Sequence, residues 1–315
     1  MRRGISFVFL FGFLAACSAG GDTAPFAESR TPPGLAERFY PPEGWAWGFV
    51  QLGEAPAQRY GVAAATGTAR ADILILPDYG ETAETWFETV HDLTGRGYRV
   101  WVLEAAGQGG SGRLRGPRDM GDAQSFDPDV AAVRAMANVV IRPTSASPLF
   151  VLAQGTGAVV AVQAVRAGAP AMGLALSSPK LGVEAGARPP TPGARSWRGD
   201  MKNAFAVGAT HDPWRGAVTF AWQRANPDLR MGGPSARWSM ALRKAAGDAR
   251  GDLKGIKAPT LVIEGQRAGG CLEAPHCLAV RLAGAGEALE LERDGVRDAW
   301  IAAIDDFIRR SQERV

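Results

Sequence analysis

Residues 149–161 read LFVLAQGTGAVVA, and this stretch decides the fold. Its apolar first half predicts a strand buried on both faces, and its small-residue second half predicts a helix packed closely on that strand. The turn between them, from Ala153 to Gly157, has the layout of a nucleophile elbow, where G-x-S-x-G places an attacking hydroxyl on a sharp bend. Gly155 stands at the serine position. The stretch therefore predicts the bend without its usual reactive side chain.

Apolar segments upstream of this stretch repeat a strand and helix rhythm. Residues 72–77 and 99–103 are largely apolar runs, as buried parallel strands require. Helical spacing over residues 84–94 lies between them, and residues 44–67 predict an opening pair of strands. A chain of 315 residues with 46% hydrophobic content can bury one large core. We therefore expect an α/β fold with a mostly parallel, doubly wound sheet.

Three further segments resemble the bacterial lysophospholipase and monoacylglycerol lipase branch of the α/β-hydrolases, which is serine aminopeptidase S33-like. Residues 104–113, EAAGQGGSGR, are similar to its D-x-R-G-x-G-x-S-x-G loop, and residues 226–238, NPDLRMGGPSARW, to its cap. Residues 258–265 resemble the strand that presents its catalytic acid. The resemblance implies an α/β-hydrolase fold over residues 43–315, with a helical cap insertion at about residues 180–251.

The same resemblance assigns three positions to a nucleophile, acid and histidine triad, and none carries the expected group. Gly155 is in the nucleophile slot and Ala268 is in the acid slot. Alignment through the start of a closing helix at residues 296–308 puts Glu287 in the histidine slot. Alignment through an expected last strand at residues 288–292 deletes that loop instead. Either way no catalytic residue is intact, because glycine has no nucleophile and no histidine follows residue 276.

The oxyanion side of the predicted site also departs from the family. Its H-G motif appears as Pro77-Asp78-Tyr79-Gly80, and a carboxylate there would repel a developing oxyanion. We expect the side chain of Thr156 to point away from the pocket while its backbone N–H remains a donor. The predicted ligand-binding residues are Asp78, Tyr79, Gln154, Gly155 and Thr156. The cap tryptophans Trp214, Trp222 and Trp238 either line this pocket or belong to the core of the cap.

Two functions remain open from these residues. The first is a catalytically inactive homologue that binds a lipid or acyl ligand in the old acyl pocket, or an envelope protein partner on its surface. The alternative is an active carboxylic-ester hydrolase or lysophospholipase with non-standard residues, for which His211 in the cap and Ser178 at a strand end are candidates.

The first residues predict export and a membrane anchor. Residues 1–16 carry Arg2 and Arg3, an apolar run and small residues, as in a secretory signal peptide. Residues 14–17, LAAC, resemble a bacterial lipobox, which implies lipidation of Cys17; a plain secretory signal is the alternative. Residues 17–42 are rich in Gly, Ala, Thr and Pro and predict a flexible tether. We expect a lipid-anchored envelope protein, at the outer membrane facing the periplasm.

The remaining composition limits partners and cofactors. The 35 basic and 32 acidic residues nearly balance, so no nucleic-acid partner is expected. Cys271 and Cys277 are expected to form a local disulfide in an oxidising compartment. A metal site with His276 is the competing interpretation, but it lacks a fourth ligand. Neither a metal nor a cofactor is therefore predicted.

Overall fold

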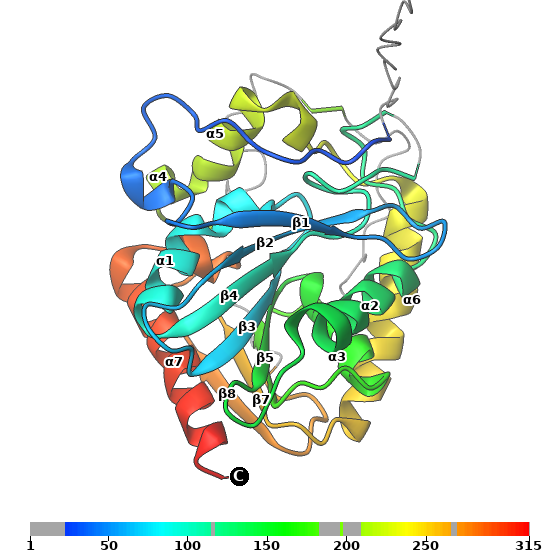
Figure 1. The fold of residues 1–315 in the computed structure, drawn as a ribbon. Coiled ribbons are helices and arrows are strands. Elements are labelled where there is room, and N and C mark those ends of the chain that lie inside the picture. Colours follow the sequence, from blue (N-terminus) through cyan, green and yellow to red (C-terminus); the bar gives the residue numbers. More distant parts are fainter. Residues whose placement is uncertain (1–22, 115–116, 183–195, 198–208, 266–269, 315) are drawn as a thin grey trace, which may run out of the picture.

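The computed structural model describes residues 23–114, 117–182, 196–197, 209–265 and 270–314. Its centre is one eight-stranded sheet with the order β1-β2-β4-β3-β5-β6-β7-β8 (Figure 1). The strands β1, β2 and β4 pair antiparallel, and every other neighbouring pair is parallel. The strands are β1 (Ala46–Val50), β2 (Gln58–Ala63), β3 (Ala71–Leu76), β4 (Tyr98–Leu103), β5 (Leu149–Gln154), β6 (Gly173–Ser177), β7 (Thr260–Glu264) and β8 (Cys277–Arg281).

Helices cover both faces of this sheet, as Figure 1 shows, and the predicted doubly wound α/β-hydrolase fold is confirmed. Successive residues of β3 point to opposite faces. Leu74 and Leu76 join one core cluster, and Ile73 and Ile75 join the other. One face of the sheet carries the helices α2 (Asp127–Ala135), α3 (Gly157–Arg166) and α6 (Ala236–Asp252), and the π-helix η3 (Met136–Ile141) continues α2. The other face carries η2 (Ala83–Trp86), α1 (Phe87–Gly95) and α7 (Asp294–Gln312).

The last strand lies earlier in the chain than the sequence suggests. β8 begins at Cys277 and pairs with β7, whereas the expected strand at residues 288–292 is the short 3-10 helix η6 (Leu289–Leu291). The prediction of that strand is wrong because Leu289 and Leu291 are buried against the core as a single turn. The predicted disulfide is present, with the Cα atoms of Cys271 and Cys277 5.6 Å apart at the start of β8.

The described part of the expected tether lies against the body. The Phe26 N–H donates to the Gly110 carbonyl at 2.7 Å, and the Arg30 N–H donates to Asn226 Oδ1 at 2.7 Å. Phe26 also packs on an apolar cluster that includes Phe39, at the end of η1 (Glu37–Phe39). Residues 23–42 are therefore not a free tether. Cys17 and residues 1–22 lie outside the described residues. Within the described ranges, no helix is both long and apolar enough to cross a membrane.

The expected cap range divides into two parts. The helices α4 (Pro213–Gly216) and α5 (Val218–Ala225), the short η4 (Pro227–Leu229) and η5 (Leu253–Gly255), and α6 all lie between β6 and β7. The residues Trp238, Leu242 and Ala246 of α6 belong to the core cluster that α3 also lines. Among the described residues of this range, α4, α5 and η4 contribute nothing to that cluster. Residues 183–195 and 198–208 lie outside the described residues, so the bounds of the cap at residues 180–251 stay a prediction.

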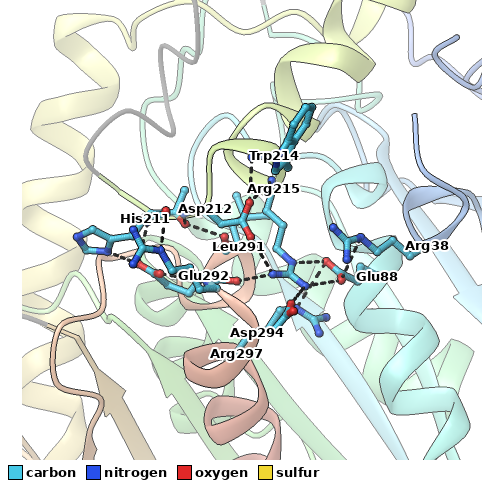
Figure 2. A network of polar contacts seen from close by, with 12 residues as sticks. Arg38, Glu88, His211, Asp212, Trp214, Arg215, Leu291, Glu292, Asp294 and Arg297 are labelled. Atoms are coloured by element: carbon cyan, nitrogen blue, oxygen red, sulfur yellow. Dashed lines mark hydrogen bonds and ion pairs between the residues drawn. The ribbon is translucent and has the colours of Figure 1, made fainter. Parts of the chain in front are cut away.

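Arg215 fixes the small helix α4 onto the sheet domain. Its guanidinium contacts Glu88 of α1 through Nε and Nη2, both at 2.8 Å, and Asp294 of α7 through Nη2 at 2.6 Å (Figure 2). It also donates to the side chain of Asp212 at 3.0 Å and to the Glu292 carbonyl at 2.9 Å. The Arg215 side chain is nearly inaccessible, so one residue holds two elements of the domain to the cap.

Arg215→Lys is expected to lower the free energy of unfolding by about 1–2 kcal/mol, because lysine keeps the charge but cannot reproduce the forked bonds. Urea unfolding followed by circular dichroism measures this difference. Arg224→Lys, on the exposed side of α5, serves as the matched control and should change the value by less than about 0.5 kcal/mol. Equal effects of the two variants would contradict an anchoring role for Arg215.

Candidate functional site

The predicted elbow is present between β5 and α3. Gly155 has a φ of 51°, a left-handed conformation that glycine adopts without strain. At Gly157, an added Cβ would lie 2.3 Å from the Leu76 carbonyl oxygen, so the helix can approach β3 only with glycine there. The Gly155 N–H donates to the Ser177 carbonyl at 3.0 Å and ties the bend to β6. The backbone of a nucleophile elbow is therefore formed without a nucleophile.

Asp78 occupies the space in front of Gly155. A Cβ built on Gly155 would lie 2.2 Å from Asp78 Cγ, inside any allowed contact. Asp78 Oδ1 accepts hydrogen bonds from the backbone N–H groups of Thr156 at 2.8 Å and Tyr79 at 2.7 Å. In an elbow of this kind, the N–H after the nucleophile is a donor of the oxyanion hole. The carboxylate of Asp78 therefore lies where the oxyanion of a reacting ester would bind.

Thr156 contributes its side chain as well as its backbone to this arrangement. Its Oγ1 donates to Asp78 Oδ1 at 2.8 Å. The expectation that this side chain points away from the pocket is wrong. The Thr156 hydroxyl turns toward the elbow because the negative charge of the Asp78 carboxylate attracts its proton.

Lys180 completes the charge balance of the site. Its Nζ lies 2.6 Å from Asp78 Oδ2, and its backbone N–H donates to the Gly155 carbonyl at 3.0 Å. Burial alone would raise the pKa of Asp78, but the Lys180 ammonium and the N–H donors outweigh it and hold that pKa below its usual value. Burial would also lower the pKa of Lys180, yet the Asp78 carboxylate raises it. Both groups are therefore charged at neutral pH.

Two further carboxyl groups lie behind Asp78. Glu81 Oε2 accepts from the Asp78 N–H at 2.9 Å and from Trp86 Nε1 at 3.0 Å. Burial, and next the charge of Asp78, raise the pKa of Glu81 to about 7. Burial and the adjacent Glu81 raise the pKa of Glu290 well above its usual value. The two carboxyl groups therefore do not both ionise at neutral pH, which leaves Asp78 as the partner of Lys180.

The five predicted ligand-binding residues separate in the structure. Asp78, Gly155 and Thr156 meet at the elbow. Tyr79 supplies its N–H there, but its hydroxyl donates to the Gly232 carbonyl at 3.0 Å, outside the elbow. Gln154 is buried, and its Nε2 donates to the Glu287 carbonyl at 2.7 Å. The loop that carries the predicted histidine slot thus lies beside β5, with Glu287 in it. Ala268, the predicted acid slot, lies outside the described residues.

The cap tryptophans do not form a pocket wall over Gly155. Trp222 is buried in an apolar cluster with Phe87. Trp238 is buried against Tyr79, with ring centroids 4.6 Å apart. Trp214 is 78% exposed on α4. The core interpretation therefore holds for Trp222 and Trp238, while Trp214 is a surface residue.

Neither candidate substitute for the triad, His211 or Ser178, has a side chain hydrogen-bonded to Asp78. His211 Nδ1 lies 2.8 Å from Glu292 Oε1, at the edge of the network in Figure 2. Ser178 has a φ of 42° and a buried Oγ without a hydrogen-bond partner. Within the described ranges, no cluster of three or more His, Cys, Asp and Glu side chains is arranged to hold a metal ion.

Sequence reasoning missed Lys180, Glu81 and Glu290. The signal available for Lys180 was its place, three residues after the end of β6, since the carboxyl ends of parallel strands meet at one edge of a sheet. Nothing in the spacing of Glu81 and Glu290, more than 200 positions apart, indicates that they lie together. Their proximity follows from the tertiary fold alone.

The sheet order and the elbow define an α/β-hydrolase fold. The family described as "Serine aminopeptidase, S33" matches residues 67–285, and the chain belongs to this family. Lysophospholipase L2 of Escherichia coli K12 is 23% identical over 276 residues, which cover 76% of this chain and 80% of that protein.

Two solved structures show the same fold at low sequence identity. Monoglyceride lipase of Saccharomyces cerevisiae has a TM-score of 0.63 and 13% identity, over 84% of this chain and 94% of that chain. A probable hydrolytic enzyme of Pseudomonas aeruginosa PAO1 has a TM-score of 0.60 and 16% identity, over 90% and 99%. The resemblance predicted from the sequence is therefore confirmed.

Proposed function

We propose that this protein is a catalytically inactive member of its family, anchored to a membrane by lipid on Cys17, that binds a lipid-like ligand or an envelope protein. The observation that carries the proposal is the position of Asp78. Its carboxylate accepts the hydrogen bond of the Thr156 N–H and occupies the space next to Gly155, and the Lys180 ammonium neutralises its charge there. The same groups would have to bind a substrate carbonyl in an active enzyme.

Displacing Asp78 would be unfavourable. A substrate oxygen in that place must break the ion pair with Lys180 and three hydrogen bonds to Oδ1. A hydrogen bond to a charged group is worth about 1.5–3 kcal/mol, so the exchange opposes substrate binding. Even after displacement, Gly155 offers no atom that could attack. Loss of the nucleophile removes most of the rate enhancement of a triad, because its members act as a unit.

The alternative, an active ester hydrolase or lysophospholipase, rests on one structural observation besides the family. His211 and Glu292 form an imidazole and carboxylate pair, with Glu292 almost completely buried. Such a pair orients a general base in many hydrolases. A nucleophile beside it is required for the same chemistry, and the contacts of His211 join it to Glu292 rather than to Ser178.

Labelling by a fluorophosphonate separates the two functions. The full-length chain in mild non-ionic detergent is expected to incorporate no label and to hydrolyse neither a short-chain ester nor a lysophospholipid above the buffer rate. Escherichia coli Lysophospholipase L2, assayed in parallel, is the comparison protein. Stoichiometric labelling would overturn the proposal. Loss of that labelling in Ser178→Ala or His211→Ala would then identify the catalytic residues.

The anchor is tested by fractionation. The chain is expected in the membrane fraction, released by detergent but not by high salt, and Cys17→Ser is expected to move it to the soluble fraction. A lipid with more than one acyl chain on Cys17 would bury enough CH₂ groups for stable attachment, whereas a folded domain with balanced charge has little electrostatic attraction to lipid. Recovery of the unmodified chain in the soluble fraction would contradict lipidation at Cys17.

A further inference from the structure

The fixed part of the N-terminal segment begins close to Cys17. The Thr23 carbonyl accepts from the Arg113 N–H at 2.9 Å. The next carbonyl, that of Ala24, accepts from Arg118 Nη1. Thr23 is the sixth residue after Cys17, and a chain extends by at most about 3.6 Å for each residue. A lipid on Cys17 would therefore keep Thr23 within about 22 Å of the membrane surface.

This reach is short compared with the size of the domain. A compact body of roughly 290 residues has a radius of gyration of about 19 Å and is about 50 Å across. The side of the body opposite Thr23 therefore could not lie against the lipid, and the side near Thr23 would face it. The side chains around Thr23 then decide how closely the body approaches the membrane.

Exposed apolar side chains flank the point where the chain leaves the body. Leu114 is 41% exposed and follows the residue that binds Thr23. The turn between β1 and β2 carries Leu52, which is 40% exposed, and ends at Ala57. The Ala57 carbonyl accepts from the Gly112 N–H at 2.7 Å. A Cβ added at Gly112 would lie 3.2 Å from the Thr23 carbonyl oxygen, so the turn and this loop meet beside Thr23.

A third exposed apolar side chain lies on the same side of the sheet. Phe49 of β1 is 41% exposed and is paired directly with Arg59 of β2. Residues directly opposite each other on antiparallel strands share one face. Arg59 Cζ lies 5.8 Å from the centroid of the Phe26 ring, so Phe49 is on the face that the N-terminal segment crosses. We call the three side chains of Phe49, Leu52 and Leu114 the exit patch.

The charges near the exit patch do not attract an anionic surface. Among the described residues 23–28, 49–57 and 110–114, the exposed charged side chains are those of Glu28 and Glu54, both acidic. The side chain of Arg113 in the same set is buried. A lipid surface at this place would therefore be contacted through apolar side chains and not through opposite charge.

We propose that the exit patch docks into the interfacial region of the phospholipid bilayer that holds the anchor. This proposal deepens the proposed anchoring and rests on lipidation of Cys17. Three partly exposed side chains suffice because the short linker holds them at a high effective concentration next to the membrane. Docking gives the anchored domain one orientation, with the β1 edge of the sheet toward the lipid.

Fluorescent probes on single cysteines test the exit patch. With lipid on Cys17 and a disulfide between Cys271 and Cys277, a cysteine introduced by Leu52→Cys or Leu114→Cys is the one thiol that takes the probe. The full-length chain is reconstituted into phosphatidylcholine vesicles that contain a spin-labelled lipid. Both probes are expected to lose about half of their fluorescence or more, because docked apolar side chains lie about 5–10 Å inside the headgroup and acyl boundary.

Leu278→Cys is the matched control. Leu278 is 50% exposed on β8, at the opposite edge of the sheet from β1 (Figure 1). A probe there is expected to keep its fluorescence in the same vesicles and to be quenched by iodide from solution. Added salt or anionic lipid is expected to leave the lipid quenching at positions 52 and 114 unchanged.

Flotation with the vesicles reports the anchor separately from the docking. A chain that floats while its probes at positions 52 and 114 are quenched no more than the control probe would overturn the docking and leave the anchor standing. A chain that does not float would overturn both. Lipid quenching that requires anionic lipid would overturn an apolar contact. Shielding of both probes from iodide in native membranes but not in vesicles would mean that an envelope protein covers the patch, which overturns the proposal.

Discussion

Arg59→Met is expected to lower the free energy of unfolding by at least about 3–5 kcal/mol, because it leaves two carboxylates buried without a counter-ion. The side chains of Arg59, Glu84 and Glu104 are completely inaccessible to solvent. Arg59 Nη2 lies 2.9 Å from Glu84 Oε1 and 2.6 Å from Glu104 Oε1. Although burial opposes its charge, these two carboxylates raise the pKa of Arg59 above its usual value.

Urea unfolding measures this loss, provided that the dependence of the free energy of unfolding on urea concentration is the same for the variant and the natural protein. The matched control is Lys244→Met, which breaks the solvent-exposed pair with Asp248 and should leave the unfolding midpoint unchanged. The triple variant Arg59→Met with Glu84→Gln and Glu104→Gln is expected to regain part of the stability, since it removes the uncompensated charges. If the free energy of unfolding of Arg59→Met lies within about 1 kcal/mol of that of the natural protein, water or another cation reaches the two carboxylates.

Restoring the serine of the motif is expected to destabilise the protein without creating a hydrolase. Gly155→Ser combines left-handed strain with an overlap on Asp78, and the two effects together should lower the free energy of unfolding by about 2–5 kcal/mol. Neither fluorophosphonate labelling nor ester turnover is expected, because the new serine hydroxyl would lie against the Asp78 carboxylate and would have no histidine to act as its general base.

A double-mutant cycle with Asp78→Ala isolates the overlap. In that background, Gly155→Ser is expected to be less destabilising by about 1–3 kcal/mol. Gly53→Ser is the control for strain alone, since Gly53 has a φ of 55° and no heavy atom near its added Cβ. If Gly155→Ser loses no more stability than Gly53→Ser, Asp78 moves aside freely. Such an outcome would weaken the proposal that it blocks the site.

The predictable part of the fold is the part that local pattern encodes. The strand and helix around Gly155 could be predicted because buried parallel strands are continuously apolar and the turn is marked by glycine. β8 was missed because it is an edge strand, with Leu278 50% exposed. The composition of residues 23–42 predicts a flexible tether, but a few contacts, such as the hydrogen bond from the Phe26 N–H to the Gly110 carbonyl, hold this segment against the domain. Such single contacts leave no signal in the composition.

The site was predictable only as a set of positions. The sequence places Asp78 near Gly155 through the family motif, and the structure confirms that proximity. It does not indicate that the carboxylate turns inward, because this depends on Lys180, three residues after the end of β6, and on the N–H of Thr156. Electrostatic partners that come from different strands have no fixed spacing in the chain, so sequence pattern alone cannot pair them.

The contact between Asp78 and Gly155 also has an evolutionary consequence. A mutation that introduces any side chain at position 155 meets the carboxylate, and one that removes the carboxylate leaves Lys180 facing a bare glycine. Neither change alone gives a working nucleophile, and selection acts on single steps. For an inactive chain, as proposed, the arrangement would close the short mutational routes back to catalysis, so that drift among its descendants would preserve the proposed loss rather than reverse it.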